Sequence, residues 1–411
     1  MATTRYYHPE YRQAEVSAIV AALDRGQSVS VIGPPSVGKT NLLRYLDQER
    51  LSATDPTSPW LRYAPLSREQ GSIVTINIDP NALLPSLPHE TGEIAASAWP
   101  GFELLIHRTT IKTQLYPTVR ARGEANAELA EEIERLQTRF NSAHPDVSDF
   151  EDRLHAHLAL RHLESLLDSA LSSRRLQNAP IRIAYFMDEF ERFLQTMPNY
   201  FFVALRSIRD RFKYEVMFVT FTRNSLPYLA GNRVQVLEPF LELFHDNAVY
   251  LHPFVDDDAW RMIEQLEEKS VSQDDYALGL LIRSTGGFAG LLRAGFKHVD
   301  KLAHLHGSDY HHAIDLAANR LSAETNVQAE CETLLRGLNS VEIETLFGVM
   351  NRKTELDPHT IRELLNKSLL RQDSSPAGVC VVPPVLAAYI RNHPSPPKPR
   401  PPAPPATLPE N

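Results

Sequence analysis

The sequence predicts an α/β protein built around a parallel β-sheet, and three observations lead to that prediction. Short runs rich in apolar or β-branched residues recur along the chain, at residues 29–32, 73–78, 181–187, 215–221 and 248–251. Segments with apolar residues at helical spacing separate these runs. The first four runs are each followed directly by a glycine or a polar residue, namely Gly33, Asp79, Asp188 and Thr222. Strands that alternate with helices pair in parallel, and ligands of open α/β sheets bind where the carboxyl ends of the strands meet.

Length and composition exclude several classes of protein. A chain of 411 residues with 43 % hydrophobic and 23 % charged residues suits a soluble protein of several domains. The net charge of −9 excludes a protein whose whole surface attracts nucleic acid or anionic lipid, so any DNA contact must be local. The two cysteines, Cys331 and Cys380, exclude a disulfide framework and a cysteine zinc site. Without an apolar stretch of membrane-spanning length or a signal-peptide core, we expect a cytoplasmic protein without membrane contact.

A glycine loop follows the first apolar run and fits the pattern G-x-x-x-x-G-K-[ST]. Leu42, Leu43 and Leu46 come next at helical spacing, so the pattern lies between a strand and a helix, as in phosphate-binding loops. Gly33 and Gly38 let the backbone turn its N–H groups toward phosphate oxygens, and the helix N-terminus adds positive charge. The residues expected to hold the phosphates are Gly33, Pro34, Pro35, Ser36, Val37, Gly38, Lys39, Thr40 and Asn41.

Two acidic residues at the end of the run at 181–187 complete the predicted chemistry. We expect Lys39 to reach the β- and γ-phosphates, and Thr40 and Asp188 to bind Mg²⁺. Glu189 is expected to polarise the attacking water. The pattern predicts ATP and Mg²⁺ as cofactors. Lys39 and Asp188 lie far apart in the sequence, and a helical insertion at residues 82–179 accounts for that separation.

Further polar residues are candidates at the same edge of the sheet. Arg223 and Asn224 follow the run at 215–221, level with the expected γ-phosphate, although Asn224 also suits a cap for a short helix at 226–230. Arg293 lies one turn inside a helix at 289–302, where it either swings toward the nucleotide or remains on the surface. Arg12 and Glu15, on a helix at 11–26, are either contacts to the base or ordinary solvated charges.

The insertion has a strongly charged middle helix. Residues 123–141 carry a narrow apolar stripe between helices expected at 95–115 and 150–173. Such a stripe predicts either an exposed coiled-coil arm that grips a partner or a helical insertion packed on its own domain. The sequence does not decide between the two.

The C-terminal region predicts a winged helix-turn-helix. Short helices are expected at 341–350 and 360–369, and a hairpin with strands 370–373 and 379–382 follows. DNA binding would place Arg362, Lys367 and Arg371 near phosphates. The region holds as many acidic as basic residues, which favours a protein contact or an autoinhibitory role over DNA binding.

The predicted organisation is an ATPase core at 1–254, a small helical lid at 255–325, the winged helix at 326–393 and a proline-rich disordered tail at 394–411. With these parts in order, the chain resembles a bacterial or archaeal P-loop ATPase of the AAA+/STAND kind. The resemblance rests on the stretches GPPSVGKT, FMDEFERF, FTRNSLPYL and TGGFAGLLR and on the C-terminal winged helix. It implies a P-loop NTPase fold and roles for Lys39, Thr40, Asp188 and Glu189, and also for Arg223 and Arg293.

We therefore expect an ATP-hydrolysing switch whose nucleotide state controls assembly or the binding of a protein partner in a multi-component system, of the defence, signalling or transposition type. A DNA-binding or DNA-loading ATPase, similar to replication initiators and transposition regulators, is the first alternative. A scaffold that binds nucleotide without hydrolysing it is the second. The sequence leaves self-association and the identity of the partner open.

Overall fold

The computed structural model describes most of the chain, with gaps. The described residues are 7–47, 59–66, 72–80, 98–112, 149–176, 181–267, 274–302, 310–353, 355–374 and 378–394. The helix predicted at 123–141 and the proline-rich tail lie outside them.

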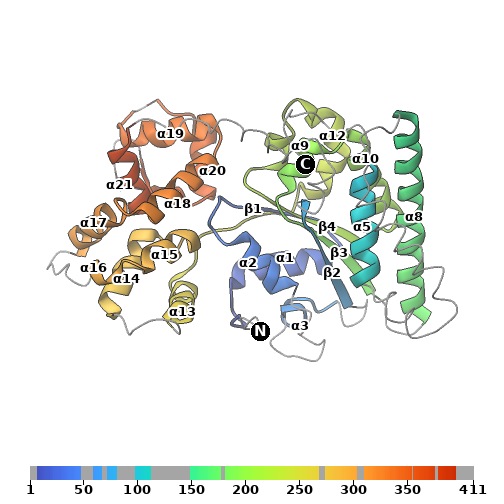
Figure 1. Cartoon of the computed structure of the whole chain (residues 1–411), viewed down its shortest axis with the longest axis horizontal. Coiled ribbons are helices and arrows are strands. Elements are labelled where there is room, and N and C mark those ends of the chain that lie inside the picture. Colours follow the sequence, from blue (N-terminus) through green and yellow to red (C-terminus); the bar gives the residue numbers. More distant parts are fainter. Residues whose placement is uncertain are drawn as a thin grey trace, which may run out of the picture.

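Five parallel strands form the central sheet in the order β2-β3-β4-β1-β5 (Figure 1). The strands are β1 (Val29–Ile32), β2 (Ser72–Ile78), β3 (Ile181–Met187), β4 (Val216–Thr222) and β5 (Ala248–Tyr250). Every predicted strand is therefore present. The α/β prediction is confirmed, and the glycine loop lies between β1 and the helix that follows it.

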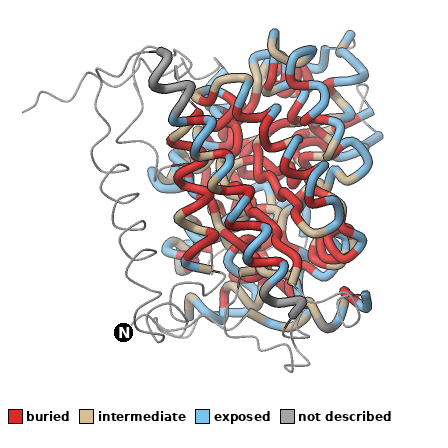
Figure 2. Tube along the Cα trace, turned by 90° about the vertical axis from the view of Figure 1, so that its right-hand side faces the viewer, coloured by how far each residue is buried: buried red, intermediate tan, exposed pale blue. Residues whose placement is uncertain are grey.

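The inner strands are buried on both faces, which explains why most of their residues are apolar. In β3, Ala184 and Phe186 belong to one apolar core, whereas Ile183 and Tyr185 belong to a second core on the other face. The first core lies under α1 (Gln13–Asp24) and α2 (Lys39–Leu46). Figure 2 shows buried positions filling the interior, with exposed positions recurring along the outer helices.

Most other helices of the N-terminal half cover the second core. They are α5 (Trp99–Lys112), α8 (Asp149–Leu176), α9 (Phe190–Thr196), α10 (Asn199–Arg211), α11 (Leu226–Ala230) and α12 (Val234–Leu241), with the 3₁₀ turns η4 (Gly231–Arg233) and η5 (Glu242–Phe244). Helices α5 and α8, which belong to the predicted insertion, pack against each other and against this core (Figure 1). The short helix α3 (Pro59–Tyr63) lies in the connection between α2 and β2 and was not predicted.

The chain after β5 is helical except for one hairpin. Its helices are α13 (Asp256–Glu267), α14 (Asp275–Thr285), α15 (Ala289–Phe296), α16 (Val299–Leu302), α17 (Tyr310–Leu321), α18 (Thr325–Arg336), α19 (Ser340–Met350), α20 (Pro358–Asn366) and α21 (Pro384–Asn392). The hairpin pairs β6 (Leu370–Gln372) with β7 (Val379–Val381) in antiparallel register. We call residues 325–394 the C-terminal segment. Its buried apolar residues join the core under α1 and α2, so the C-terminal segment packs on the glycine-loop side of the molecule.

Among the described residues, no helix combines the length and the apolar character needed to cross a bilayer.

Candidate nucleotide site

The glycine loop, residues 33–40, begins at the carboxyl end of β1 beside the end of β4. The Gly33 N–H donates to the Thr222 carbonyl at 3.0 Å, which fixes the start of the loop relative to β4. Gly38 is the N-cap of α2 and has φ of +102°, a conformation that residues with a Cβ rarely adopt. A sharp turn followed by a helix N-terminus is the geometry that presents N–H groups to an anion. We call residues 33–40 the cradle.

Lys39 extends back over the cradle. Its Nζ donates to the carbonyls of Gly33 at 2.6 Å and Pro34 at 3.0 Å. Desolvation by burial lowers the pKa of Lys39 to about 8, while the charge of Glu191 is the strongest influence in the opposite direction. An anionic ligand in the cradle would favour the charged ammonium.

Thr40 and Asp188, the two predicted metal ligands, come together at the edge of the sheet. Thr40 Oγ1 lies 3.2 Å from Asp188 Oδ2, although 148 residues separate them in the sequence. A hydroxyl and a carboxylate are ligands that Mg²⁺ accepts, and this ion keeps its remaining positions for water and phosphate oxygens. The residues present therefore fit a Mg²⁺ ion bound together with a nucleotide.

Glu189, predicted to activate water, follows Asp188 at the start of α9 with φ of +44°. Its N–H donates to Asp188 Oδ1 at 2.9 Å, which orients that carboxylate. Its own side chain lies 2.7 Å from Arg192 Nε and is partly exposed. A water-activating role therefore requires Glu189 to be released from Arg192 or to act while paired with it.

Arg223 forms an ion pair that the sequence analysis missed. Its Nε lies 3.0 Å from Oε1 of Glu191, a buried residue on the first turn of α9. Burial raises the pKa of Glu191. The signal that could have revealed this pair was the position of Glu191, only two residues beyond Glu189 in the stretch FMDEFERF.

The start of α15 packs on the tip of the cradle. The Gly290 N–H donates to the Ser36 carbonyl at 2.9 Å, and a Cβ on Gly290 would lie 2.5 Å from the Ser36 Cβ. Arg293 comes three residues later, close to Gly290 on the helix surface, and its side chain is exposed. No side-chain contact of Arg293 is seen among the described residues, so a turn toward the nucleotide and a place on the surface both stay open.

Helix α18 also contacts the cradle. The Ser36 hydroxyl donates to Oε2 of Glu330. Gly337, just after α18, lies so close to Pro35 that a Cβ there would be 2.2 Å from the Pro35 Cγ. Two cradle residues thus meet the C-terminal segment, which the sequence analysis did not foresee. Val37 is buried beneath the loop, and Asn41 is half-buried on α2.

Arg12 is buried, so the alternative of an ordinary solvated charge is wrong, and a contact to the base stays a prediction. It is 3 % exposed, and its guanidinium donates to the Val37 carbonyl at 2.5 Å and the His252 carbonyl at 2.6 Å. The group also lies 4.4 Å from the ring centroid of Phe254. Arg12 therefore fixes the backbone of the cradle at Val37 relative to the chain at His252.

Asn224 is bound by the C-terminal segment and does not cap a helix. Its Oδ1 accepts a hydrogen bond from Nζ of Lys367, which lies 2.5 Å from Glu342 Oε1. Lys367 is 1 % exposed. The DNA-binding alternative would place Lys367 near phosphates, and this arrangement does not allow that contact, because the ammonium is buried between the side chains of Asn224 and Glu342.

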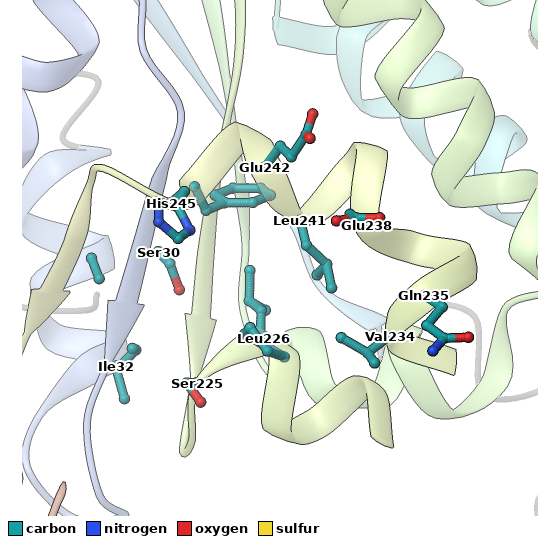
Figure 3. A pocket seen from close by; sticks show the side chains of 13 residues that line it. Ser30, Ile32, Ser225, Leu226, Val234, Gln235, Glu238, Leu241, Glu242 and His245 are labelled. Atoms are coloured by element: carbon teal, nitrogen blue, oxygen red, sulfur yellow. The ribbon is translucent and has the colours of Figure 1, made fainter. Parts of the chain in front are cut away.

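A cavity of about 380 Å³ lies near the cradle without including it. Ser30 and Ile32 of β1 line it together with residues of α11, α12 and β5 (Figure 3). Val29 and Val31 face the core under α1 and α2, so the cavity lies on the opposite face of β1.

The parallel sheet and the glycine loop between β1 and α2 define a P-loop α/β fold. No protein-family model matches the chain, and no curated protein does. The chain resembles the Walker-type ATPase paby2304 of Pyrococcus abyssi at 13 % identity and a TM-score of 0.48, covering 92 % of this chain and 95 % of that one. It also resembles the Aeropyrum pernix ORC2 protein in its ADPNP–ADP complexes, at 12 % identity, a TM-score of 0.47 and coverage of 94 % and 95 %. A third similar structure is Cdc6p from Pyrobaculum aerophilum, at 11 % identity, a TM-score of 0.37 and coverage of 96 % and 97 %.

Proposed function

We propose that this protein is a Mg²⁺-dependent ATPase whose bound nucleotide controls how its C-terminal segment is held, and thereby how it binds a protein partner. The observation that carries the proposal is the meeting of three parts of the chain at one site. Lys39 and Thr40 come from the cradle, Asp188 from the end of β3, and Glu330 from the C-terminal segment.

The hydrolytic part of the proposal follows from the charges at this site. Lys39 and the N–H groups of the cradle stabilise the negative charge that spreads over the transferring phosphoryl group. Thr40 and Asp188 would hold Mg²⁺, which supplies further neutralisation of the phosphates when it is bound. Glu189 orients the attacking water.

The switching part rests on two contacts between the C-terminal segment and the site. Glu330 accepts from Ser36 in the cradle, and Lys367 donates to Asn224 at the end of β4. A negatively charged phosphate chain in the cradle would repel the Glu330 carboxylate, and a γ-phosphate near the end of β4 would compete for Lys367 and Asn224. Nucleotide binding would therefore favour a second arrangement of the C-terminal segment.

Binding of a fluorescent ATP analogue and release of phosphate, both with Mg²⁺, test the enzyme. We expect the wild-type protein to bind and hydrolyse ATP, and Lys39→Ala to lose binding by at least about 100-fold, because the phosphates lose their main cationic contact. Equal affinities for the two proteins would refute the assignment of the cradle. Hydrogen exchange of residues 325–394 with and without ATP tests the switch: unchanged protection would refute it.

A DNA-binding ATPase is the second candidate, because α19, α20 and the β6–β7 hairpin follow one another as in a winged helix, with Arg362 and Arg371 exposed. If these arginines contact phosphates, affinity for duplex DNA falls steeply with salt and falls further in Arg362→Ala/Arg371→Ala. Negligible binding with and without ATP would remove this candidate. Lys367 is left out of the test because it is buried.

A scaffold that binds nucleotide without hydrolysing it is distinguished by Glu189→Gln. Equal background rates of phosphate release from this variant and the wild-type protein, at saturating ATP, would support the scaffold.

A further inference from the structure

Glu191 is a buried acid that the proposed hydrolytic mechanism does not use. The residue is 8 % exposed, and its Oε1 lies 3.0 Å from Nε of Arg223. Its second oxygen, Oε2, is buried and has no hydrogen-bond partner among the described residues. A buried carboxylate is costly unless it is paired, so its place beside the cradle calls for an explanation.

Arg223, its partner, lies at the level of the cradle. Thr222 is paired in register with Ile32 of β1, and its carbonyl accepts from the Gly33 N–H. Arg223 is the next residue, so it leaves β4 beside the first residue of the cradle. Lys39 donates to the carbonyl of that same residue, Gly33. Arg223 and Lys39 are therefore two cations placed around the start of one loop.

The contact between Arg223 and Glu191 uses only one of the nitrogen donors of the guanidinium, Nε. An arginine has N–H groups at Nε and at both terminal nitrogens. In the part of the chain that the structure describes, no hydrogen bond is seen at Nη1 or Nη2 of Arg223, and its side chain is 42 % exposed. Glu191 thus holds the guanidinium at Nε and leaves the two terminal nitrogens, Nη1 and Nη2, available for a ligand.

We propose that Glu191 is a positioning residue, which holds Arg223 by Nε so that Nη1 and Nη2 bind the γ-phosphate of a nucleotide in the cradle. The inference rests on the proposed function. A planar fork suits phosphate oxygens, and an arginine fixed in advance loses less conformational freedom when it binds them. An arginine at this position stabilises charge in phosphoryl transfer, as arginine fingers do. Glu189 does not hold Arg223, because its carboxylate is paired with Arg192.

A double-mutant cycle tests the inference. The variants are Arg223→Ala, Glu191→Gln and the two combined, with Arg161→Gln as a matched control that breaks an Arg–Glu pair of 2.9 Å on α8. For each we would measure kcat and KM for ATP hydrolysis and the affinities for fluorescent analogues of ATP and ADP. Thermal melting checks that each variant is folded, and Glu191→Asp replaces Glu191→Gln if the latter is not.

We expect Arg223→Ala to lower kcat by roughly 10³-fold with little change in KM, and to reduce the preference for ATP over ADP. Glu191→Gln should lower kcat by roughly tenfold, in the same direction, because the amide holds Nε less firmly. The double variant should be no slower than Arg223→Ala alone, since Glu191 acts through Arg223. Arg161→Gln should behave as the wild type.

Two results would overturn the inference while leaving the proposed function intact. One is a hydrolysing wild-type protein in which Glu191→Gln lowers kcat by the same factor with and without Arg223. The other is an unchanged preference for ATP over ADP in Arg223→Ala. If the wild-type protein binds no nucleotide, the proposed function itself is wrong.

Discussion

Lys367 and Asn224, 143 residues apart in the sequence, share a hydrogen bond that joins the C-terminal segment to the end of β4. The same ammonium is paired with Glu342 at 2.5 Å, and both charged side chains are almost fully buried. The carboxylate also accepts from the Asn339 N–H at 3.0 Å, which caps α19. One lysine therefore connects the start of α19, the end of α20 and the strand end beside the nucleotide site.

Removing this lysine should be costly to stability. Lys367→Met leaves Glu342 buried without its cation, and we expect the free energy of unfolding to fall by about 3 kcal/mol. Urea denaturation provides the measurement. The double variant Lys367→Met/Glu342→Gln should recover much of the loss, because no unpaired charge is then buried. A loss below about 1 kcal/mol in the single variant would mean that the pair is solvated.

Nucleotide affinity should depend on pH through Lys39. Burial lowers the pKa of Lys39 to about 8 in the free protein, and a bound triphosphate favours the ammonium, so the pKa of the complex is higher. Affinity is then full below this pKa and falls as pH rises through it, by up to about tenfold per pH unit. Titration of a fluorescent ATP analogue on both sides of that pKa measures the effect. Lys39→Arg, whose guanidinium stays charged, is the control; the same fall in this variant would assign the effect to another group.

Glu189→Gln should separate binding from hydrolysis. The variant keeps the N–H that orients Asp188, and it removes the charge that polarises water. We expect kcat to fall by about 10²- to 10⁴-fold, the usual contribution of a general base, with affinity for ATP retained. Phosphate release and equilibrium binding are measured on the same preparation. Full activity in Glu189→Gln would show that Glu189 does not polarise the attacking water.

The contact of Gly337 with the cradle predicts a difference between two glycine substitutions. In Gly337→Ala the new Cβ would lie 2.2 Å from the Pro35 Cγ, so the cradle or the end of α18 must move, at a cost of about 1–3 kcal/mol. In Gly279→Ala, inside α14, the added Cβ meets nothing within 4 Å, and the helix should gain up to about 1 kcal/mol. Thermal melting of both variants gives the comparison. Similar melting temperatures would show that α18 does not press on the cradle in solution.

The sequence predicted the features that depend on residues close together in the chain or on the parallel pairing of the strands. The five strands were predicted because each is a short run rich in apolar or β-branched residues, and the cradle because Gly38, Lys39 and Thr40 are neighbours along the chain. The meeting of Thr40 with Asp188 was also predicted, because the carboxyl ends of parallel strands lie at one edge. The short helix α3 was missed, because five residues carry too little periodicity to mark a helix.

The sequence by itself thus determined the sheet, the glycine loop and the residues that a phosphate chain and its metal would need. Only the tertiary structure decided which charged side chains are buried around that loop. Arg12, Glu330 and Lys367 look like surface residues in the sequence, yet each of them bonds to a residue at least 25 positions away. Arg12 is enclosed by the chain around Val37, His252 and Phe254, whereas Lys367 and the half-buried Glu330 bond to Asn224 and Ser36 across the contact with the C-terminal segment. Spacing along the chain does not encode such long-range packing.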